Sequence, residues 1–207
     1  MDIYDDTPYG CRKTKVYIAD VTAFAVVVYD LETNDSWRIQ NRLMYPSPKY
    51  GIFNIASDSF DLMDGVLGMA ISKKSKLSYN DDRLLYFHAL ASATENKVSL
   101  NLINNATIWK DNTEAEPRAF EELGSRGTQS AAQAMDSNGN LFFGLMNPIS
   151  IACWDTNTPY NVNNVHIVAA NDETLQFASG VKVIVNLEGQ EELWVLSCRL
   201  QVIIINN

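Results

Sequence analysis

The segment 172–177 carries the densest set of side chains that could do chemistry. It supplies two carboxylates, a hydroxyl, an amide and an aromatic ring within a few residues. An organic amine is bound by an anion, by hydrogen-bond partners for its hydroxyls and by an aromatic face. These group types are offered by Glu173, Thr174, Gln176 and Phe177. The alternative interpretation is a polar turn with a capping aspartate, followed by a core phenylalanine.

Three other polar residues lie where inner strands are predicted. Ser130 and Gln133 belong to a predicted strand at 130–135. Asp64 precedes a glycine in a turn signal, just before a small-residue strand predicted at 65–72. If these strands surround a channel, the three side chains are candidates for its lining, although a turn role is favoured for Asp64.

His88 and His166 are too few for a three-histidine metal site. Apolar neighbours predict that both are packed or hydrogen-bonded structural residues. The alternative for His88 is a base that moves a proton during catalysis. Because the sequence shows no nucleophile triad, phosphate loop, dinucleotide fingerprint or zinc spacing, we expect no metal and no other cofactor.

Short runs of aromatic and aliphatic residues indicate the β-strands of the fold. They begin at Val16, Leu84, Leu141 and Leu193, and a second apolar run that could form a hairpin follows each. A loose repeat of strands and turns with little helix is typical of a β-propeller. We predict an all-β chain that forms about three and a half blades. Residues 1–207 are one incomplete propeller domain, in which 1–14 is a poorly defined N-terminal segment.

The connecting segments have weaker patterns. Residues 41–62 are predicted as a long connection, and 110–128 as a surface loop in which 117–123 could form a short helix. Residues 97–103 alternate as a strand does, and 201–207 is also strand-like. A blade count below four predicts part of a larger protein, an incomplete gene model or a half that pairs with another chain, because an open propeller exposes long strand edges. The first two are favoured.

Charge and hydropathy exclude several functions. The net charge of −9 repels phosphate backbones, so we expect no nucleic-acid partner. No apolar run reaches the ~20 residues that cross a bilayer, so we expect no membrane partner. The acidic N-terminus lacks the basic and then apolar pattern of a secretory signal. Hydrophobic residues make up 46% of the chain, which is enough for a core.

Eight blocks in order resemble the insect yellow and major royal jelly protein family. The blocks are Val16–Val21 with Val26–Asp30, Phe60–Ile71, Leu85–Ser92, Gln129–Ser137, Leu141–Gly144, Ile151–Trp154, Asp172–Phe177 and Leu193–Ser197. The likeness runs from about residue 15 to residue 201. It implies a six-bladed propeller and an extracellular insect protein. The family's signal segment and first blades have no counterpart here, which indicates a truncated chain.

The resemblance implies roles in pigmentation and melanin chemistry, in royal jelly, or in salivary binding of biogenic amines. No agreed catalytic constellation exists to carry over. We therefore expect a non-enzymatic protein that binds a small aromatic amine or catechol in the central channel. One alternative is a dopachrome isomerase with His88 as the base. Another is a structural or nutritional protein without a specific ligand, and the oligomeric state stays open.

The cysteines and glycosylation sequons depend on the same resemblance. Cys11 and Cys153 match positions where the family keeps cysteines, which implies a disulfide between them or to segments outside the chain. Cys198 stands where relatives usually have asparagine, so an amide near the channel is lost. Secretion would make Asn34 and Asn105 candidates for N-glycosylation.

Overall fold

The chain folds into antiparallel sheets whose strands follow one another in sequence order. The computed structural model describes residues 2–4, 11–73 and 83–206. The strands of the first sheet are β1 (Asp2–Tyr4), β2 (Lys15–Asp20), β3 (Ala25–Asp30) and β4 (Asp35–Gln40). Residues 1 and 5–10 of the predicted N-terminal segment lie outside the described residues.

Two further four-stranded sheets repeat this meander. The second sheet contains β7 (Val66–Ile71), β8 (Leu84–Ala89), β9 (Thr94–Ser99) and β10 (Glu121–Ser125). The third sheet contains β11 (Gln133–Met135), β12 (Asn140–Met146), β13 (Ile149–Asp155) and β14 (Val165–Ala170). A two-stranded sheet follows, formed by β15 (Phe177–Val185) and β16 (Glu191–Cys198). The all-β class is confirmed by these strands.

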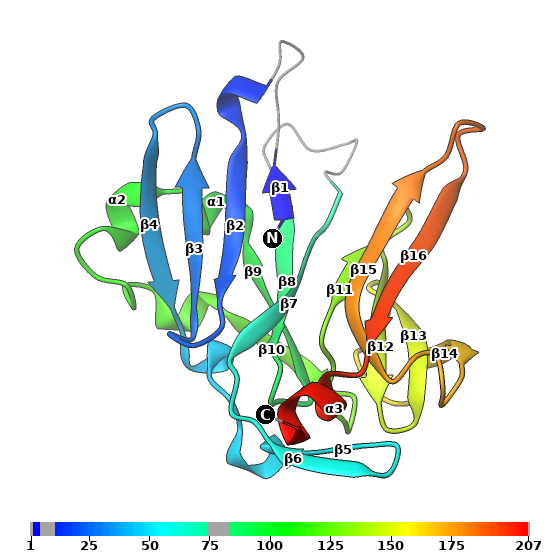
Figure 1. Ribbon diagram of the computed structural model, residues 1–207. Helices are drawn as coiled ribbons and strands as arrows, with labels where there is room; N and C mark the ends of the chain where they lie inside the picture. Colours follow the sequence, from blue (N-terminus) through cyan, green and yellow to red (C-terminus); the bar gives the residue numbers. More distant parts are fainter. Residues whose placement is uncertain (1, 5–10, 74–82, 207) are drawn as a thin grey trace.

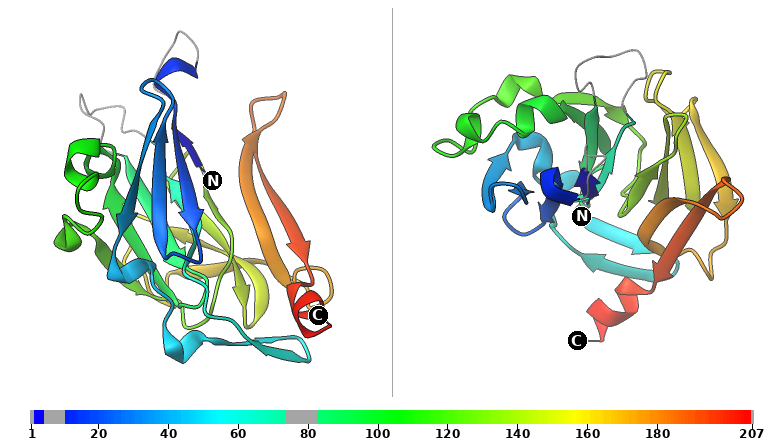
Figure 2. Two further views of the ribbon diagram at one scale, coloured as in Figure 1. Left: turned by 60° about the vertical axis from the view of Figure 1, so that its left-hand side comes forward. Right: turned by 90° about the horizontal axis from the view of Figure 1, so that it is seen from above.

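The first strands of the later sheets stand next to one another. Strand β11 contacts β7 on one side and β15 on the other, and β7 also contacts β2. Seen from above, the sheets are arranged around a common centre (Figure 2, right). In Figure 1, β7 and β15 begin at the same, lower end of the molecule. Residues just before these strands are therefore brought to one face.

Glycines let neighbouring sheets approach closely. A Cβ atom on Gly68 in β7 would lie 2.4 Å from the His88 ring and 2.7 Å from the carbonyl oxygen of Ala131. A Cβ atom on Gly144 in β12 would lie 2.5 Å from the Cβ of Ala178. Real Cβ atoms do not approach other atoms so closely. Both positions therefore require glycine, which has no side chain.

The connection between the first two sheets contains a hairpin. Within residues 41–62, β5 (Ile52–Ile55) pairs with β6 (Asp58–Asp61). The long connection predicted there thus contains, in its second half, a hairpin that was not predicted. Each strand has only four residues, so its alternation is too short to predict a strand.

Aromatic packing and one glutamine hold this hairpin in place. The Phe53 and Phe60 rings stack with centroids 5.2 Å apart, in a buried cluster that also contains Phe177. Gln129 donates from Nε2 to the carbonyl oxygens of Tyr50 and Ile52, at 3.0 and 2.8 Å. The hairpin consequently crosses the lower end of the molecule in Figure 1, near the starts of β7 and β15.

The surface loop predicted at 110–128 is also wrong in part. It contains a 3-10 helix at Pro117–Ala119 and then β10, which pairs with β9. The expected short helix is thus present over fewer residues than predicted. Strand β10 is the outer strand of its sheet and is mostly exposed, so its polar sequence lacks the alternation that marks a half-buried strand.

Two predicted strands become helical. The strand predicted at 97–103 ends at Ser99, and α1 (Leu100–Ile103) and α2 (Ala106–Trp109) follow. Most of the segment predicted at 201–207 belongs to α3 (Leu200–Ile205) instead of a strand, and residue 207 lies outside the described residues. In α3, Gln201 is buried and Ile204 packs on the Phe53 cluster. Residues three apart lie on the same face of a helix. The sequence does not show this period, because almost every residue of the run is apolar.

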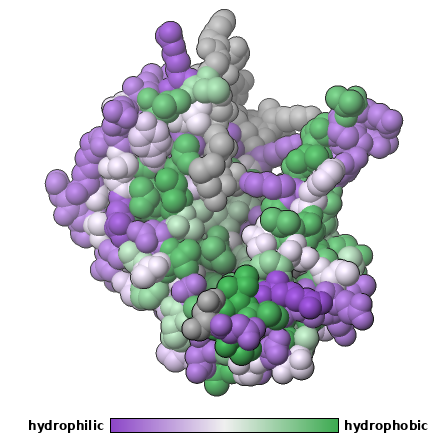
Figure 3. Space-filling model, viewed as in Figure 1, coloured by the Kyte–Doolittle hydropathy of each residue, from purple (hydrophilic) through white to green (hydrophobic). Residues whose placement is uncertain are grey.

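Apolar side chains remain exposed on the last sheet. Trp194 and Leu196 of β16 are 60% and 69% exposed. Figure 3 shows apolar surface over this hairpin, at the upper right. Within the described residues, no helix is long and apolar enough to span a membrane.

Candidate functional site

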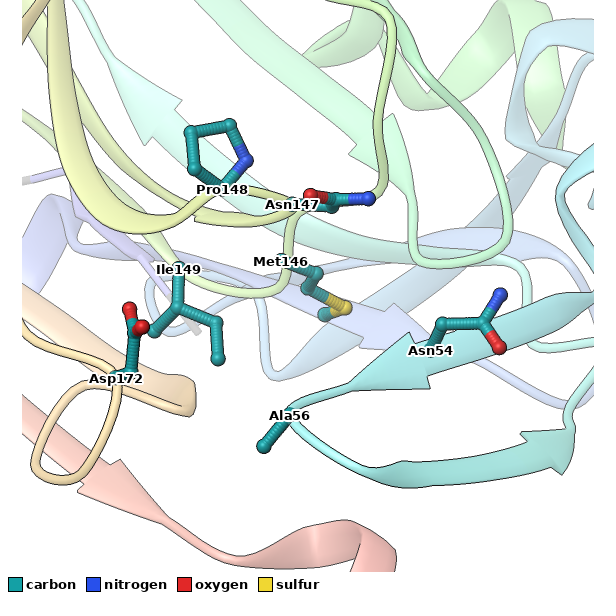
Figure 4. Close-up of a pocket in the computed structure, with 7 residues that line it drawn as sticks. All are labelled: Asn54, Ala56, Met146, Asn147, Pro148, Ile149 and Asp172. Carbon is teal, nitrogen blue, oxygen red and sulfur yellow. The ribbon is translucent and has the colours of Figure 1, made fainter.

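A pocket of about 470 Å³ lies beside the β5–β6 hairpin. The hairpin, the β12–β13 turn and the loop after β14 form its wall. The residues that line it are Asn54, Ala56, Met146, Asn147, Pro148, Ile149 and Asp172. Figure 4 shows Asp172 and Asn54 on opposite sides of Met146. Segments far apart in the sequence therefore meet at this pocket.

The lining combines one negative charge with amides and apolar groups. Asp172 is the one charged residue among the described residues that line the pocket. Asn54 and Asn147 add amide groups, whereas Met146 and Ile149 add apolar surface. Pockets of about 300–1,000 Å³ accept small organic ligands. The described residues contain no group of three or more metal-ligating side chains. The chemistry of the pocket therefore suits a small cationic organic molecule.

A turn in the loop after β14 places Asp172 at the pocket. The Asn171 side-chain oxygen accepts hydrogen bonds from the backbone N–H groups of Glu173 and Thr174, at 3.0 and 2.9 Å. Such a turn needs a side-chain acceptor two or three residues earlier, which asparagine provides. Glu173 and Thr174 are exposed, and neither lines the pocket.

The other two predicted ligand residues of this segment serve the fold. Gln176 donates from Nε2 to the carbonyl oxygen of Asp172 at 2.8 Å and accepts from Gln201 at 2.6 Å. Phe177 is buried in the cluster around Phe53. The structure therefore does not gather the four predicted residues around one pocket, and it places their neighbour Asp172 there instead.

The remaining predicted lining residues are mostly enclosed. Ser130 is fully buried, and its hydroxyl has no hydrogen bond within the described part of the chain. Gln133 is buried and donates from Nε2 to Glu95 at 3.1 Å. Asp64 is half-buried just before β7, and burial raises the pKa of its carboxyl group. None of the three lines the pocket beside the hairpin. Gln133 does line two smaller hollows between β7, β11 and β15.

A buried ionic network joins the second and third sheets. The Glu95 carboxylate on β9 accepts hydrogen bonds from His88 Nδ1 at 2.9 Å and from Arg126 Nη1 at 3.1 Å. Its other oxygen accepts from Gln133 on β11. The side chains of His88, Glu95 and Arg126 are all fully buried. A buried carboxylate needs such partners because isolated charges are costly in an apolar interior.

His88 belongs to this network and not to the pocket. Its Nε2 lies 3.1 Å from the Ala131 carbonyl oxygen, so both ring nitrogens face acceptors. Burial, reinforced by the positive charge of Arg126, lowers the pKa of the imidazole, whereas Glu95 opposes the shift. A neutral imidazole has one N–H group and can donate to one acceptor at a time. The position of His88 suits a structural link between sheets.

Arg126 extends the network to aromatic residues of the third sheet region. Its Nη1 donates to the Tyr160 hydroxyl at 3.4 Å, and its guanidinium carbon lies 5.8 Å from the centre of the Phe143 ring. Burial raises the pKa of Tyr160 to about 12, although the Arg126 charge opposes this. The hydroxyl therefore stays protonated at neutral pH.

The other predicted residues lie away from both features. All three cysteines are free, so the implied bridge between Cys11 and Cys153 is not formed. The prediction that His166 is packed is wrong, because this residue is exposed on β14, an edge strand. The sequon residues Asn34 and Asn105 are both exposed.

Sequence reasoning missed most of the pocket. Asn54 lies in a hairpin that was not predicted, and Asn147 lies in a turn between two strands. The one available signal was the asparagine-proline pair at 147–148, which marks a turn next to a strong apolar run. This pair predicts a turn, but it does not indicate which distant segments of the chain pack beside that turn to form the pocket.

Known proteins are similar to this chain along nearly its whole length. A family model described as major royal jelly protein matches residues 1–207. A dopaminechrome tautomerase of Drosophila melanogaster is 34% identical, over 100% of this chain and 44% of its own length. Major royal jelly protein 9 of Apis mellifera is 32% identical, over 93% of this chain and 45% of its own.

Protein yellow of Drosophila melanogaster is 30% identical, over 98% of this chain and 36% of its own length. The chain thus spans less than half the length of these relatives. The family model and these three relatives confirm the family that the eight blocks resemble. The chain belongs to the yellow and major royal jelly protein family.

Proposed function

We propose that this chain is part of a secreted, pigmentation-related protein that binds a small aromatic amine or catechol at the pocket beside Asp172. The observation that carries the proposal is the pocket itself, about 470 Å³ with one carboxylate and no cation among its described lining residues. An ammonium group would face Asp172, and ring hydroxyls would bond the Asn54 and Asn147 amides. The extracellular location is part of the proposal and is supported by the family.

The sheets fit the blades of an incomplete propeller. Three four-stranded meanders and a two-stranded sheet follow one another, and the first strands β7, β11 and β15 adjoin. In this arrangement the pocket lies at the end of the molecule where inner strands begin. Loops at the end of a propeller can vary without disturbing the blades, which suits that end for binding.

Calorimetric titration with dopamine and serotonin tests the binding proposal. The 207-residue protein is expected to bind, and Asp172→Asn is expected to weaken binding by about tenfold or more, because a charge-assisted bond is lost. Asp111→Asn, at an exposed aspartate outside the pocket, is the matched control and should leave affinity unchanged. Absence of binding would instead favour a structural or nutritional role, and equal loss in both variants would remove Asp172 from the site.

A second candidate is an isomerase of aminochromes. It is favoured by the 34% identity, along all of this chain, to a relative named dopaminechrome tautomerase. Such a reaction moves protons from carbon to oxygen within one molecule, so it needs a base but no oxidant or reductant. His88 is fully buried and does not line the pocket, so the carboxylate of Asp172 is the better candidate base.

Turnover of dopaminechrome, followed by absorbance, tests the second candidate. Asp172→Asn is expected to lower the rate by about 10²-fold or more, as loss of a general base does. His88→Gln, if folded, should keep the rate. A rate that disappears in folded His88→Gln but survives in Asp172→Asn would return the role of base to the histidine.

A further inference from the structure

A second hollow, of about 240 Å³, lies between the connection after β4 and the edge of the second sheet. It shares no lining residue with the pocket beside Asp172. Two residues of opposite charge line it, Arg42 and Glu122, and both are exposed. Within the described residues, neither side chain has a hydrogen bond or an ion pair. The hollow therefore presents one unpaired cation and one unpaired anion.

Two charges close to this pair in the sequence are paired within the protein, whereas Arg42 and Glu122 are not paired in the part of the chain that the structure describes. Glu121, one residue before Glu122, pairs with Lys97 at 3.2 Å. Arg38, on the strand before Arg42, pairs with Asp20 at 2.9 Å. Two opposite charges that border the same hollow without meeting are complementary to a ligand that carries both charges. An α-amino acid at neutral pH is such a ligand, because its carboxylate would face the guanidinium and its ammonium the glutamate.

Aromatic rings border the same hollow. Tyr45 and Tyr50 both line it, and Tyr45 is 40% exposed. The centre of the Tyr45 ring lies 5.1 Å from that of the Phe24 ring, so the two rings pack against each other. The ammonium group of Lys49 lies 5.2 Å from the centre of the Tyr50 ring. Aromatic rings prefer to pack against one another in offset or tilted arrangements. The aromatic ring of a ligand could pack in this way against Tyr45 or Tyr50.

The floor of the hollow is preorganised by the buried network. Ser92 and Thr94 line the hollow, and their hydroxyl oxygens lie 3.0 Å apart. The carbonyl oxygens of both residues accept hydrogen bonds from Arg126, at 3.4 and 3.3 Å. Arg126 is itself fixed by Glu95. A rigid floor with hydroxyl groups lowers the entropic cost of binding a polar ligand.

We propose that this hollow binds an aromatic α-amino acid, such as tyrosine or its catechol derivative, through both of its charges. Arg42 binds the carboxylate, Glu122 binds the ammonium group, and the tyrosine rings border the side chain. A decarboxylated amine loses the first contact, so this site discriminates amino acids from amines. The proposal does not depend on the function assigned to the pocket beside Asp172.

Calorimetry on the 207-residue protein tests it with three probes. L-Tyrosine is expected to bind at least about tenfold more tightly than tyramine, which lacks the carboxylate. The affinity for L-tyrosine should also exceed the affinity for 3-(4-hydroxyphenyl)propanoate, which lacks the ammonium group, by a similar factor. Arg42→Gln and Glu122→Gln should each weaken tyrosine binding by about tenfold or more. The charge-matched controls are Arg118→Gln and Glu121→Gln, at exposed residues outside the hollow. They should leave the affinity for tyrosine unchanged.

Three outcomes would overturn the proposal. The first is tyramine binding as tightly as tyrosine, and the second is unchanged tyrosine affinity in both Arg42→Gln and Glu122→Gln. Asp172→Asn should leave tyrosine binding intact, so failure of one site is distinguishable from failure of the other. If Asp172→Asn alone removes tyrosine binding, the amino acid occupies the other pocket and this assignment is wrong.

Discussion

The buried charges between the second and third sheets differ from the charges that border the two pockets. Glu95 meets three donors inside the protein, from His88, Arg126 and Gln133. Asp172 and Arg42 stand at pocket rims, and neither side chain has a hydrogen bond or an ion pair within the described residues. Charges that are satisfied internally hold sheets together, whereas charges left unsatisfied at a rim are available to a ligand. Substitutions should therefore separate the two groups into stability effects and binding effects.

Arg126→Ala is expected to give the largest loss of stability. It leaves the Glu95 carboxylate buried with one charged partner fewer, which costs about 3–5 kcal/mol in the free energy of unfolding. Urea denaturation followed by tryptophan fluorescence measures the loss. Arg126→Lys, which keeps the charge, should lose less. A loss below about 1 kcal/mol for Arg126→Ala would mean that the network does not hold the sheets together.

High pH provides the second test, through Tyr160. Burial raises the pKa of its hydroxyl to about 12 in the folded protein, against about 10 in the unfolded chain. The folded state therefore binds more protons between these values, and stability falls as pH rises from about 10 to about 12. The fall amounts to about 3 kcal/mol at most. Tyr160→Phe should remove this part of the slope, and an identical slope in the variant would contradict the assignment.

Gly68→Ala tests how closely the sheets must approach. The new Cβ would collide with the His88 ring and the Ala131 carbonyl, so a loss of about 1–3 kcal/mol is expected. Gly180→Ala is the matched control, because its Cβ would find its nearest neighbour at 3.4 Å, an ordinary contact. Thermal unfolding of both variants makes the comparison. Equal losses would show that the glycine at position 68 is not needed for close approach.

Asp172→Asn should change stability least. The residue is exposed, and surface substitutions of this kind alter the free energy of unfolding by about 0.5 kcal/mol or less. The same variant is expected to lose ligand affinity, as described above. A large loss of stability would place Asp172 with the structural charges and would break the contrast drawn here.

The sequence predicted those parts of the fold in which local pattern and burial agree. Strands β2 to β4 were predictable because their apolar runs are separated by a polar turn. Strand β10 was not, because it is exposed, and α3 was not, because a run of isoleucines fits either a strand or a buried helix. Both errors arise where tertiary contacts decide between local alternatives.

The sites were predicted less well than the fold. The segment 172–177 was recognised as rich in functional groups, yet Asp172 is the member that reaches a pocket, because a turn anchored on Asn171 turns Glu173 and Thr174 outward. Arg42 and Glu122 are far apart in the sequence and carry no motif. Only the approach of the connection after β4 to the second sheet brings them to one hollow.

The hairpin β5–β6 also bears on how the chain reaches its final form. Its Phe53 and Phe60 rings belong to one cluster with Met146, Ile149 and Phe177, which are made much later during synthesis. Contacts between distant parts of a chain slow folding, because a long loop must close before they form. The early hairpin can pack on these partners only after residue 177 has been synthesised. The cluster beside the pocket therefore requires a chain that extends at least to Phe177.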